Sequence, residues 1–188
     1  MAGEGKLVVI TGPSGVGKST IVREALARTG ASFSVSATTR SPRPGEVEGV
    51  HYRFLDAEAF EKLVADGQML EWANVFGQCY GTPAAPVREA LAAGKTVILE
   101  IDVQGGLQVH ARRPDGTFIL IVPPNEAALA KRLAGRGTEA PDVMARRLAK
   151  AKDELIAASE SGAYTHVVVN DDLEKAIARV VDIINKQE

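Results

Sequence analysis

The stretch "ITGPSGVGKST" at residues 10–20 constrains the fold of this chain most, because three glycines and a lysine directly follow an apolar run. It matches G-x-x-x-x-G-K-[ST], a loop whose backbone N–H groups bind phosphates together with a helix N-terminus. The preceding "KLVVIT" indicates a buried strand, and the following "KSTIVREALART" has helical spacing and ends at Gly30. The sequence therefore predicts a strand, a phosphate-binding loop and a helix, with a nucleoside triphosphate against the loop.

Within this loop the side chains have different expected roles. Lys18 is expected to reach the β- and γ-phosphates, and Ser19 to ligate Mg²⁺. Asp102 follows the apolar run "ILEI" and is expected to hold the water shell of Mg²⁺, with Glu100 on the same side of that strand. The loop residues assigned to ATP are Gly12, Pro13, Ser14, Gly15, Val16, Gly17, Lys18, Ser19 and Thr20.

Composition narrows the class of protein further. A formal net charge of −2 leaves no global basic field for a nucleic acid, and no apolar segment approaches the length of a membrane span. The single cysteine, Cys79, permits no internal disulfide, and no secretory leader is visible. These features favour a cytoplasmic protein with small-molecule substrates and neither nucleic acid nor membrane as partner.

Apolar strands alternate with helical patterns along most of the chain, which predicts an α/β fold with a parallel sheet covered on both faces. Further strands are expected at 96–103, 117–122 and 166–170. Helices are expected from "NEAALAKRLAG", which Asn125 opens, from "DVMARRLAKAKDELIAASE" and from "DLEKAIARVVDIINK".

One region breaks the alternation. From about Phe33 to Pro83 the chain is rich in Pro, Gly, Thr and aromatic residues and reads as short strands around a helix near 56–66. We expect a core formed by 1–34 and 84–188 and an inserted mixed-β lobe at 35–83, which faces the substrate.

The sequence resembles the guanylate kinase family over nearly its whole length. The resemblance rests on "ITGPSGVGKST", "SVSATTRSPRPGEVEGVHYRF", "LEWANVFGQCYGT", "ILEIDVQG", "KRLAGRGTE" and "VVVNDDL", in that order. It implies a P-loop kinase core, a GMP-binding lobe and a mobile lid at about 133–142. The implied reaction is direct, Mg²⁺-dependent in-line transfer of the γ-phosphoryl group of ATP to GMP, giving ADP and GDP, and dGMP is expected to serve as well.

The resemblance also assigns the GMP site. Arg40 and Arg43 suit phosphate oxygens with their planar forks, and Tyr52 and Tyr80 offer hydroxyl donors to the same group. Glu71 matches a carboxylate that accepts both N1–H and N2–H of guanine, a pair of donors that adenine lacks. The other residues assigned to GMP are Ser36, Glu46, Thr82 and Glu100.

Arginines complete the predicted phosphoryl-transfer site. Arg136 lies in the lid between two glycines, and Arg147 matches a family arginine that meets the phosphates from the other side. Together with Lys18, Arg40 and Arg43 they are the predicted catalytic residues, because converging cations stabilise the charge of the transferred group. Arg132 and Asn170 are expected near the adenine, with capping of the last helix as an equal alternative for Asn170 and Asp171.

Two alternatives from other classes stay open at this stage. One is an inactive guanylate-kinase-like binding module, although Lys18, Arg136 and Arg147 are present. The other is a kinase for a different nucleoside monophosphate, against which Glu71 argues. Where similar proteins often have "GNYYGT", this sequence has Gln78 and Cys79 in place of the asparagine and the first tyrosine. Cys79 is expected to be a small packing residue. A monomer and a homodimer are both compatible with the sequence.

Overall fold

A parallel sheet forms the centre of the protein in the computed structural model, which describes residues 5–75, 77–134 and 141–186. The strand order is β2-β7-β1-β8-β9, and every pairing is parallel. The strands are β1 (Leu7–Thr11), β2 (Ser32–Phe33), β7 (Val97–Glu100), β8 (Thr117–Val122) and β9 (His166–Val169). Four of the five residues of β1 are aliphatic and all five are buried, as expected for a strand covered on both faces.

Helices cover both faces of this sheet. On one face α1 (Lys18–Thr29) and α7 (Leu173–Asn185) lie side by side, and Ile21 and Ile177 pack with alternate strand residues such as Val8 and Ile10. On the other face, Val87 of α3 (Ala84–Ala92) and Val109 of α4 (Val103–Arg112) pack against the strand residues whose side chains point to that face. The predicted α/β class is therefore confirmed.

A second, mixed sheet lies beside the first and has the order β4-β3-β6-β5. Its strands are β3 (Ala37–Thr38), β4 (Arg53–Phe54), β5 (Met69–Val75) and β6 (Gln78–Pro83), and α2 (Ala57–Ala65) packs on it. Its apolar centre is small and consists of Ala37, Phe60 and Met69, with Cys79 packed against them as predicted. We call this sheet with α2 and the loop 39–52 the lobe.

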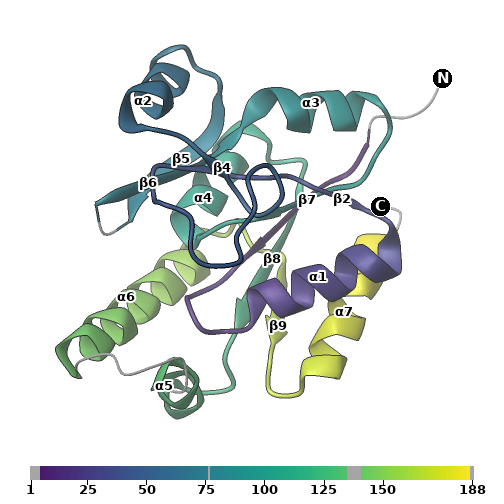
Figure 1. Cartoon of the computed structure of the whole chain (residues 1–188). Coiled ribbons are helices and arrows are strands. Elements are labelled where there is room, and N and C mark those ends of the chain that lie inside the picture. The colour runs from purple at the N-terminus through teal and green to yellow at the C-terminus, as the bar shows by residue number, and fades with distance from the viewer. Residues whose placement is uncertain (1–4, 76, 135–140, 187–188) are drawn as a thin grey trace.

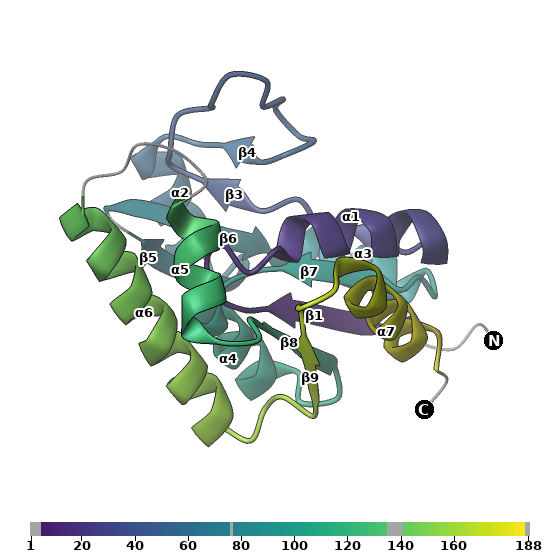
Figure 2. The ribbon, with the colours of Figure 1, turned by 90° about the horizontal axis from the view of Figure 1, so that it is seen from below.

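Helices α5 (Glu126–Ala134) and α6 (Pro141–Glu160) pack on each other. They lie below the lobe in Figure 1, and in Figure 2 they lie on the same side of the molecule as α2 and β5. Asn125 accepts a hydrogen bond from the Ala128 N–H, which confirms it as the cap of α5. Most of the predicted lid, including Arg136, lies outside the described residues. Within the described ranges, no helix is both long and apolar enough to cross a membrane.

Two sequence predictions were wrong at the ends of elements. The strand expected at 96–103 ends at Glu100, and Asp102 instead caps α4 by accepting a hydrogen bond from the Gly105 N–H at 2.8 Å. The last helix is capped by Asp172, whose carboxylate accepts from the Lys175 N–H, and not by Asn170 or Asp171. Helices α3 and α4 were not predicted, and α4 carries two adjacent glycines that weaken its helical signal.

Candidate active site

The predicted phosphate-binding loop connects the central strand β1 to α1. Gly12 has φ 146°, and a Cβ there would lie 2.3 Å from the carbonyl oxygen of Ile121, so only glycine fits. The side chain of Val16 is fully buried in the core below the loop. Lys18 Nζ donates to the carbonyl oxygen of Gly12, which ties the start of α1 back across the loop. The loop is thus anchored at both ends and in its middle.

The carbonyl of Val16 is held by two side chains from distant parts of the chain. Asn170 Nδ2 donates to it at 2.8 Å and Arg132 at 3.3 Å. Arg132 also donates to the Asn170 carbonyl at 2.7 Å, which links α5, the end of β9 and the loop. Asn170 is buried, and its amide nitrogen lies so close to Gly17 that a Cβ on Gly17 would clash with it. Contact of these two residues with adenine stays a prediction.

Two more predicted residues reach this loop from elsewhere in the fold. Arg147 on α6 donates to Ser14 Oγ at 2.7 Å, and Ser19 Oγ donates to Glu100 Oε1 at 2.6 Å. Ser19 thus pairs with Glu100 and not with Asp102, the expected metal ligand, whose Oδ1 caps α4. The first turn of α1 and the end of β7 therefore present a hydroxyl and a carboxylate to one point.

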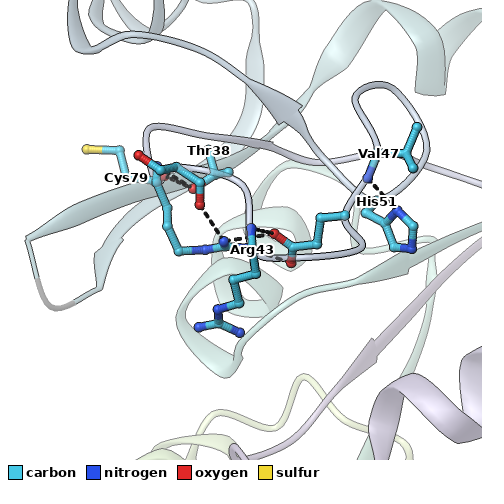
Figure 3. Close-up of polar contacts among 8 residues, drawn as sticks. Thr38, Arg43, Val47, His51 and Cys79 are labelled. Atoms are coloured by element: carbon cyan, nitrogen blue, oxygen red, sulfur yellow. Dashed lines mark hydrogen bonds and ion pairs between the residues drawn. The ribbon is translucent and has the colours of Figure 1, made fainter.

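Arg40 and Glu46 form a bidentate ion pair in the loop of the lobe. Two Arg40 nitrogens each lie 2.9 Å from a Glu46 oxygen, and Glu46 also accepts from the Arg43 N–H at 2.7 Å. These bonds hold the pKa of Glu46 near 2, and they raise the pKa of Arg40. Glu46, which the resemblance assigned to GMP, thus faces Arg40 and fixes its fork. In Figure 3 the guanidinium of Arg43 points away from this cluster.

The two tyrosines assigned to the GMP phosphate come together. The rings of Tyr52 and Tyr80 lie 6.0 Å apart, edge to face, and the Arg40 guanidinium lies 5.4 Å from the Tyr52 ring centre. Burial raises the pKa of Tyr52, and the negative charge of Glu100 acts in the same direction. The lobe residue Tyr52 is thus within electrostatic reach of Glu100 on the core sheet.

Glu71 is a buried carboxylate, only 4% exposed. It stands opposite Thr82 in the pairing of β5 with β6, and Thr82 Oγ1 donates to Glu71 Oε1 at 2.6 Å. Burial raises the pKa of Glu71 to about 7, while the Thr82 bond opposes that rise and the charge of Asp102 adds to it. A Cβ on Gly105 would lie only 2.6 Å from the second carboxylate oxygen, Oε2. The carboxylate therefore packs against the first turn of α4.

The structure thus brings the predicted residues into two groups. One surrounds the phosphate loop, and the other lines the lobe around Arg40 and Glu71, with Glu100 and Asp102 between them. Ser36 lies at the entrance to the lobe, half-buried, and its carbonyl accepts from the Arg53 N–H at 2.8 Å. Sequence reasoning missed the role of α4, and its only signal was the pair Gly105-Gly106, which begins three residues after the assigned Asp102.

The residues at this edge suit Mg²⁺ carried by a nucleotide. The Ser19 hydroxyl and the Glu100 and Asp102 carboxylates are hard oxygen donors beside the phosphate loop, and Mg²⁺ binds through few protein groups plus phosphate oxygens and water. Among the described residues no three His, Cys, Asp or Glu side chains gather into a metal-binding group. A metal here would therefore need the oxygens of the nucleotide.

Comparison with known proteins places this geometry in context. The sequence model described as guanylate kinase matches residues 4–187. A guanylate kinase of Symbiobacterium thermophilum is 50% identical over 182 residues, which cover 96% of this chain and 85% of that protein. One from Synechocystis sp. is 48% identical, with 98% and 96% covered. A crystal structure of guanylate kinase from Anaplasma phagocytophilum aligns with a TM-score of 0.75 at 32% identity, covering 96% of this chain and 85% of that one.

Proposed function

Because the chain belongs to the guanylate kinase family and is an ATP:GMP phosphotransferase, we propose that its two groups of residues divide the substrates between them. The phosphate loop holds ATP, and the lobe holds GMP. The two nucleotides then meet end to end above the carboxyl edge of the parallel sheet, where open α/β sheets bind ligands. The buried pair of Glu71 and Thr82 carries this proposal, because a buried carboxylate favours a ligand whose N–H groups can donate to the lone pairs that Thr82 leaves open.

On the ATP side, the loop amides and Lys18 bind the phosphates. Lys18 is tied to the Gly12 carbonyl, and a phosphate oxygen is a stronger acceptor that can draw the ammonium group away from it. Asn170 and Arg132 hold the Val16 carbonyl away from the anion, so that the amides of the loop face the phosphates. Arg132 also remains our candidate for contact with the adenine.

On the GMP side, Arg40, Arg43, Tyr52 and Tyr80 bind the monophosphate. Arg40 is held by Glu46 and by the ring of Tyr52, so its fork is oriented before the substrate arrives. Arg43 adds a second cation from the same loop. We assign Glu46 the orientation of Arg40, since a carboxylate in contact with the phosphate would repel it.

Guanine is read by Glu71, with Thr82 and Ser36 beside it. One Glu71 oxygen accepts from Thr82, and the carboxylate has remaining lone pairs for the N1–H and N2–H donors of guanine. Adenine cannot supply this pair of donors, so its binding would leave a buried carboxylate unsatisfied. A site of this kind rejects such analogues by a factor of order 10⁴.

Transfer itself needs the two substrates to be aligned and the charge to be stabilised. Lys18 and Arg147 lie at the phosphate loop, and Arg40 and Arg43 lie in the loop of the lobe. We expect these four cations, with Arg136 of the lid, to surround the transferred phosphoryl group. Bound Mg²⁺, held through Ser19 and Glu100 and through a water on Asp102, would neutralise the charge between the β- and γ-phosphates. The GMP phosphate oxygen is already an anion, so no general base is required.

A coupled assay with ATP, Mg²⁺ and each nucleoside monophosphate tests the proposal. We expect efficient turnover of GMP, turnover of dGMP within several-fold of it, and AMP, CMP and UMP lower by roughly three orders of magnitude or more. Omission of Mg²⁺ should abolish turnover. Equal turnover of GMP and AMP by the folded protein would refute guanine reading by Glu71.

A further inference from the structure

Strand β5 carries Glu71 at the edge of the lobe sheet, with β6 as its neighbour. An edge strand presents backbone N–H and C=O groups that need other partners. Here these partners are side chains of α4, a helix of the core. The guanine-reading strand is therefore attached to the core along its backbone.

Two side chains of α4 make this attachment. Gln108 accepts from the Trp72 N–H at 3.3 Å and donates to the Trp72 carbonyl at 2.7 Å, as a neighbouring strand would. Arg112, four residues later on the same helix face, donates to the Met69 carbonyl at 2.9 Å and to the Leu70 carbonyl. Together they bind the backbone on both sides of Glu71.

The backbone that Arg112 holds is irregular. The pairing of β5 with β6 shifts between Met69 and Glu71, so that Met69 pairs with Pro83 and Glu71 with Thr82. Leu70 is therefore the extra residue of a β-bulge. If the register of Met69 with Pro83 continued along the strand, Leu70 would stand opposite Thr82 and Glu71 opposite Gly81. The bulge therefore allows Glu71 to face the Thr82 hydroxyl while Met69 stays opposite Pro83, and bulges commonly aim side chains in this way.

The close approach of α4 explains its glycines. A Cβ on Gly105 would lie 2.6 Å from Glu71 Oε2, and one on Gly106 would lie 2.3 Å from the Tyr164 hydroxyl on the core side. Glycine within a helix is less stable than alanine, so two glycines in succession weaken α4. The small residues allow the helix to fit between the carboxylate and the core.

We propose that Gln108 and Arg112 are positioning residues for guanine recognition, which hold the bulged register of β5 against α4 and thereby keep Glu71 opposite Thr82. This inference rests on the proposed reading of guanine by Glu71. It adds that the specificity of the lobe depends on two core side chains that do not contact the substrate.

Kinetics of Gln108→Leu and Arg112→Met test the inference, with Arg113→Met as the matched control. Arg113 is the next residue and pairs with Asp115, so Arg113→Met removes the same charge and leaves both side-chain attachments of β5 in place. We expect each test variant to raise KM for GMP about tenfold or more, because small misplacements in a site have effects of that size. KM for ATP should stay within twofold, and the control should behave as wild type.

The ratio of kcat/KM for GMP to that for inosine monophosphate separates positioning from general stability. Inosine monophosphate lacks the 2-amino group, so it loses one of the two bonds to Glu71 and is less sensitive to the placement of the carboxylate. We expect the ratio to fall in both variants and to be restored in part by Arg112→Lys. A fall in kcat/KM that is equal for both monophosphates would overturn the proposal, as would unchanged KM for GMP.

Two further variants guard the result. If Arg112→Met does not fold, Gln108→Glu keeps the acceptor and loses the donor, and it should still raise KM for GMP selectively. The double variant with Glu71→Gln should show less than the sum of the single effects if Arg112 acts through Glu71. Unchanged GMP binding in Glu71→Gln alone would refute the proposed function, whereas additive effects with a strong Glu71→Gln phenotype would refute only the role of α4.

Discussion

The parallel sheet and the lobe are built on different principles. The central strands are almost continuously aliphatic, and they pack with α1, α7, α3 and α4 into two large buried clusters. The lobe has only a small apolar centre around Phe60, and polar contacts hold its parts: Thr82 with Glu71 between two strands, and Arg40 with Glu46 within the loop 39–52. Apolar burial can thus stabilise the core alone, whereas the lobe depends on hydrogen bonds, on ion pairs and on α4.

This difference has a functional meaning. The groups that stabilise the lobe in the structure are the same groups proposed to bind GMP, so binding and stability are linked there. In the core the aliphatic residues stabilise the fold, and the phosphate loop extends from it. Substitutions in the core should therefore affect ATP and those in the lobe should affect GMP, and five predictions test this difference between the two regions.

The largest effect is expected from Lys18→Ala. Loss of the cation at the transferred phosphate should lower kcat by roughly 10³-fold, a magnitude typical of groups that stabilise transition-state charge. GMP binding to the lobe should survive, as measured by isothermal titration calorimetry without ATP. A parallel loss of GMP affinity in a folded variant would show that the two regions are not separable.

Glu71→Gln should produce the reverse pattern. The amide offers one acceptor in place of two, so we expect KM for GMP to rise about 100-fold and KM for ATP to change less than twofold. Steady-state kinetics with each substrate varied in turn measures both values. Equal changes in the two KM values would contradict the assignment.

Binding of guanine should depend on pH through Glu71. With a pKa near 7 the carboxylate is about one-tenth ionised at pH 6 and nine-tenths ionised at pH 8, so affinity should rise about ninefold between them. Guanosine is the proper ligand for this titration, because it lacks the phosphate group that also titrates near pH 6. The Glu71→Gln variant should bind guanosine with no such rise.

Stability should show the opposite trend for the same reason. Between pH 4.5 and pH 7 the folded protein retains a proton on Glu71 that the unfolded chain has released, so stability falls as pH increases across this range. The total decline from this group is about 3 kcal/mol. Thermal unfolding of Glu71→Gln at pH 5 and pH 8 should lack this component.

The smallest effect is expected from Glu46→Gln, compared with Glu174→Gln. Glu46 and Arg40 side chains are 18% and 14% exposed, whereas Glu174 and its partner Arg28 are 73% and 41% exposed. Loss of the sheltered pair should release the fork of Arg40 and raise KM for GMP about fivefold, near 1 kcal/mol. Loss of the exposed pair should change neither kinetics nor stability measurably. Identical behaviour of the two variants would remove the role assigned to Glu46.

The same contrast explains what could be predicted from the sequence. The core strands and the phosphate loop could be predicted from local patterns. Continuous aliphatic runs indicate buried strands, and the glycine-rich pattern between a strand and a helix indicates a phosphate-binding loop. Helix α4 was missed because glycines are unusual within a helix. Gly105 and Gly106 are needed because Glu71 and Tyr164 lie close to them, and these contacts are not visible in the local sequence pattern. The bulge at Leu70 arises from pairing between strands, and it too lies beyond local patterns.

Within the site, the residue types were easier to predict than their partners. The resemblance assigned Glu46 to GMP, which stays a prediction, and the loop conformation shows a partner that the sequence did not indicate, Arg40. Asn170 was expected near adenine or as a helix cap, and it donates to the Val16 carbonyl because the end of β9 lies beside the phosphate loop. Such partnerships depend on contacts between segments far apart in the chain.

The bond between Asn170 and Val16 also has a consequence for how the protein is made. Its two residues are 154 positions apart, so the phosphate loop lacks one of its supports until the chain has been synthesised as far as Asn170. A nascent chain that has displayed only the loop and its first helix has the signature of an ATP site without its finished shape. The support of the phosphate loop is thus completed long after the loop itself has been made.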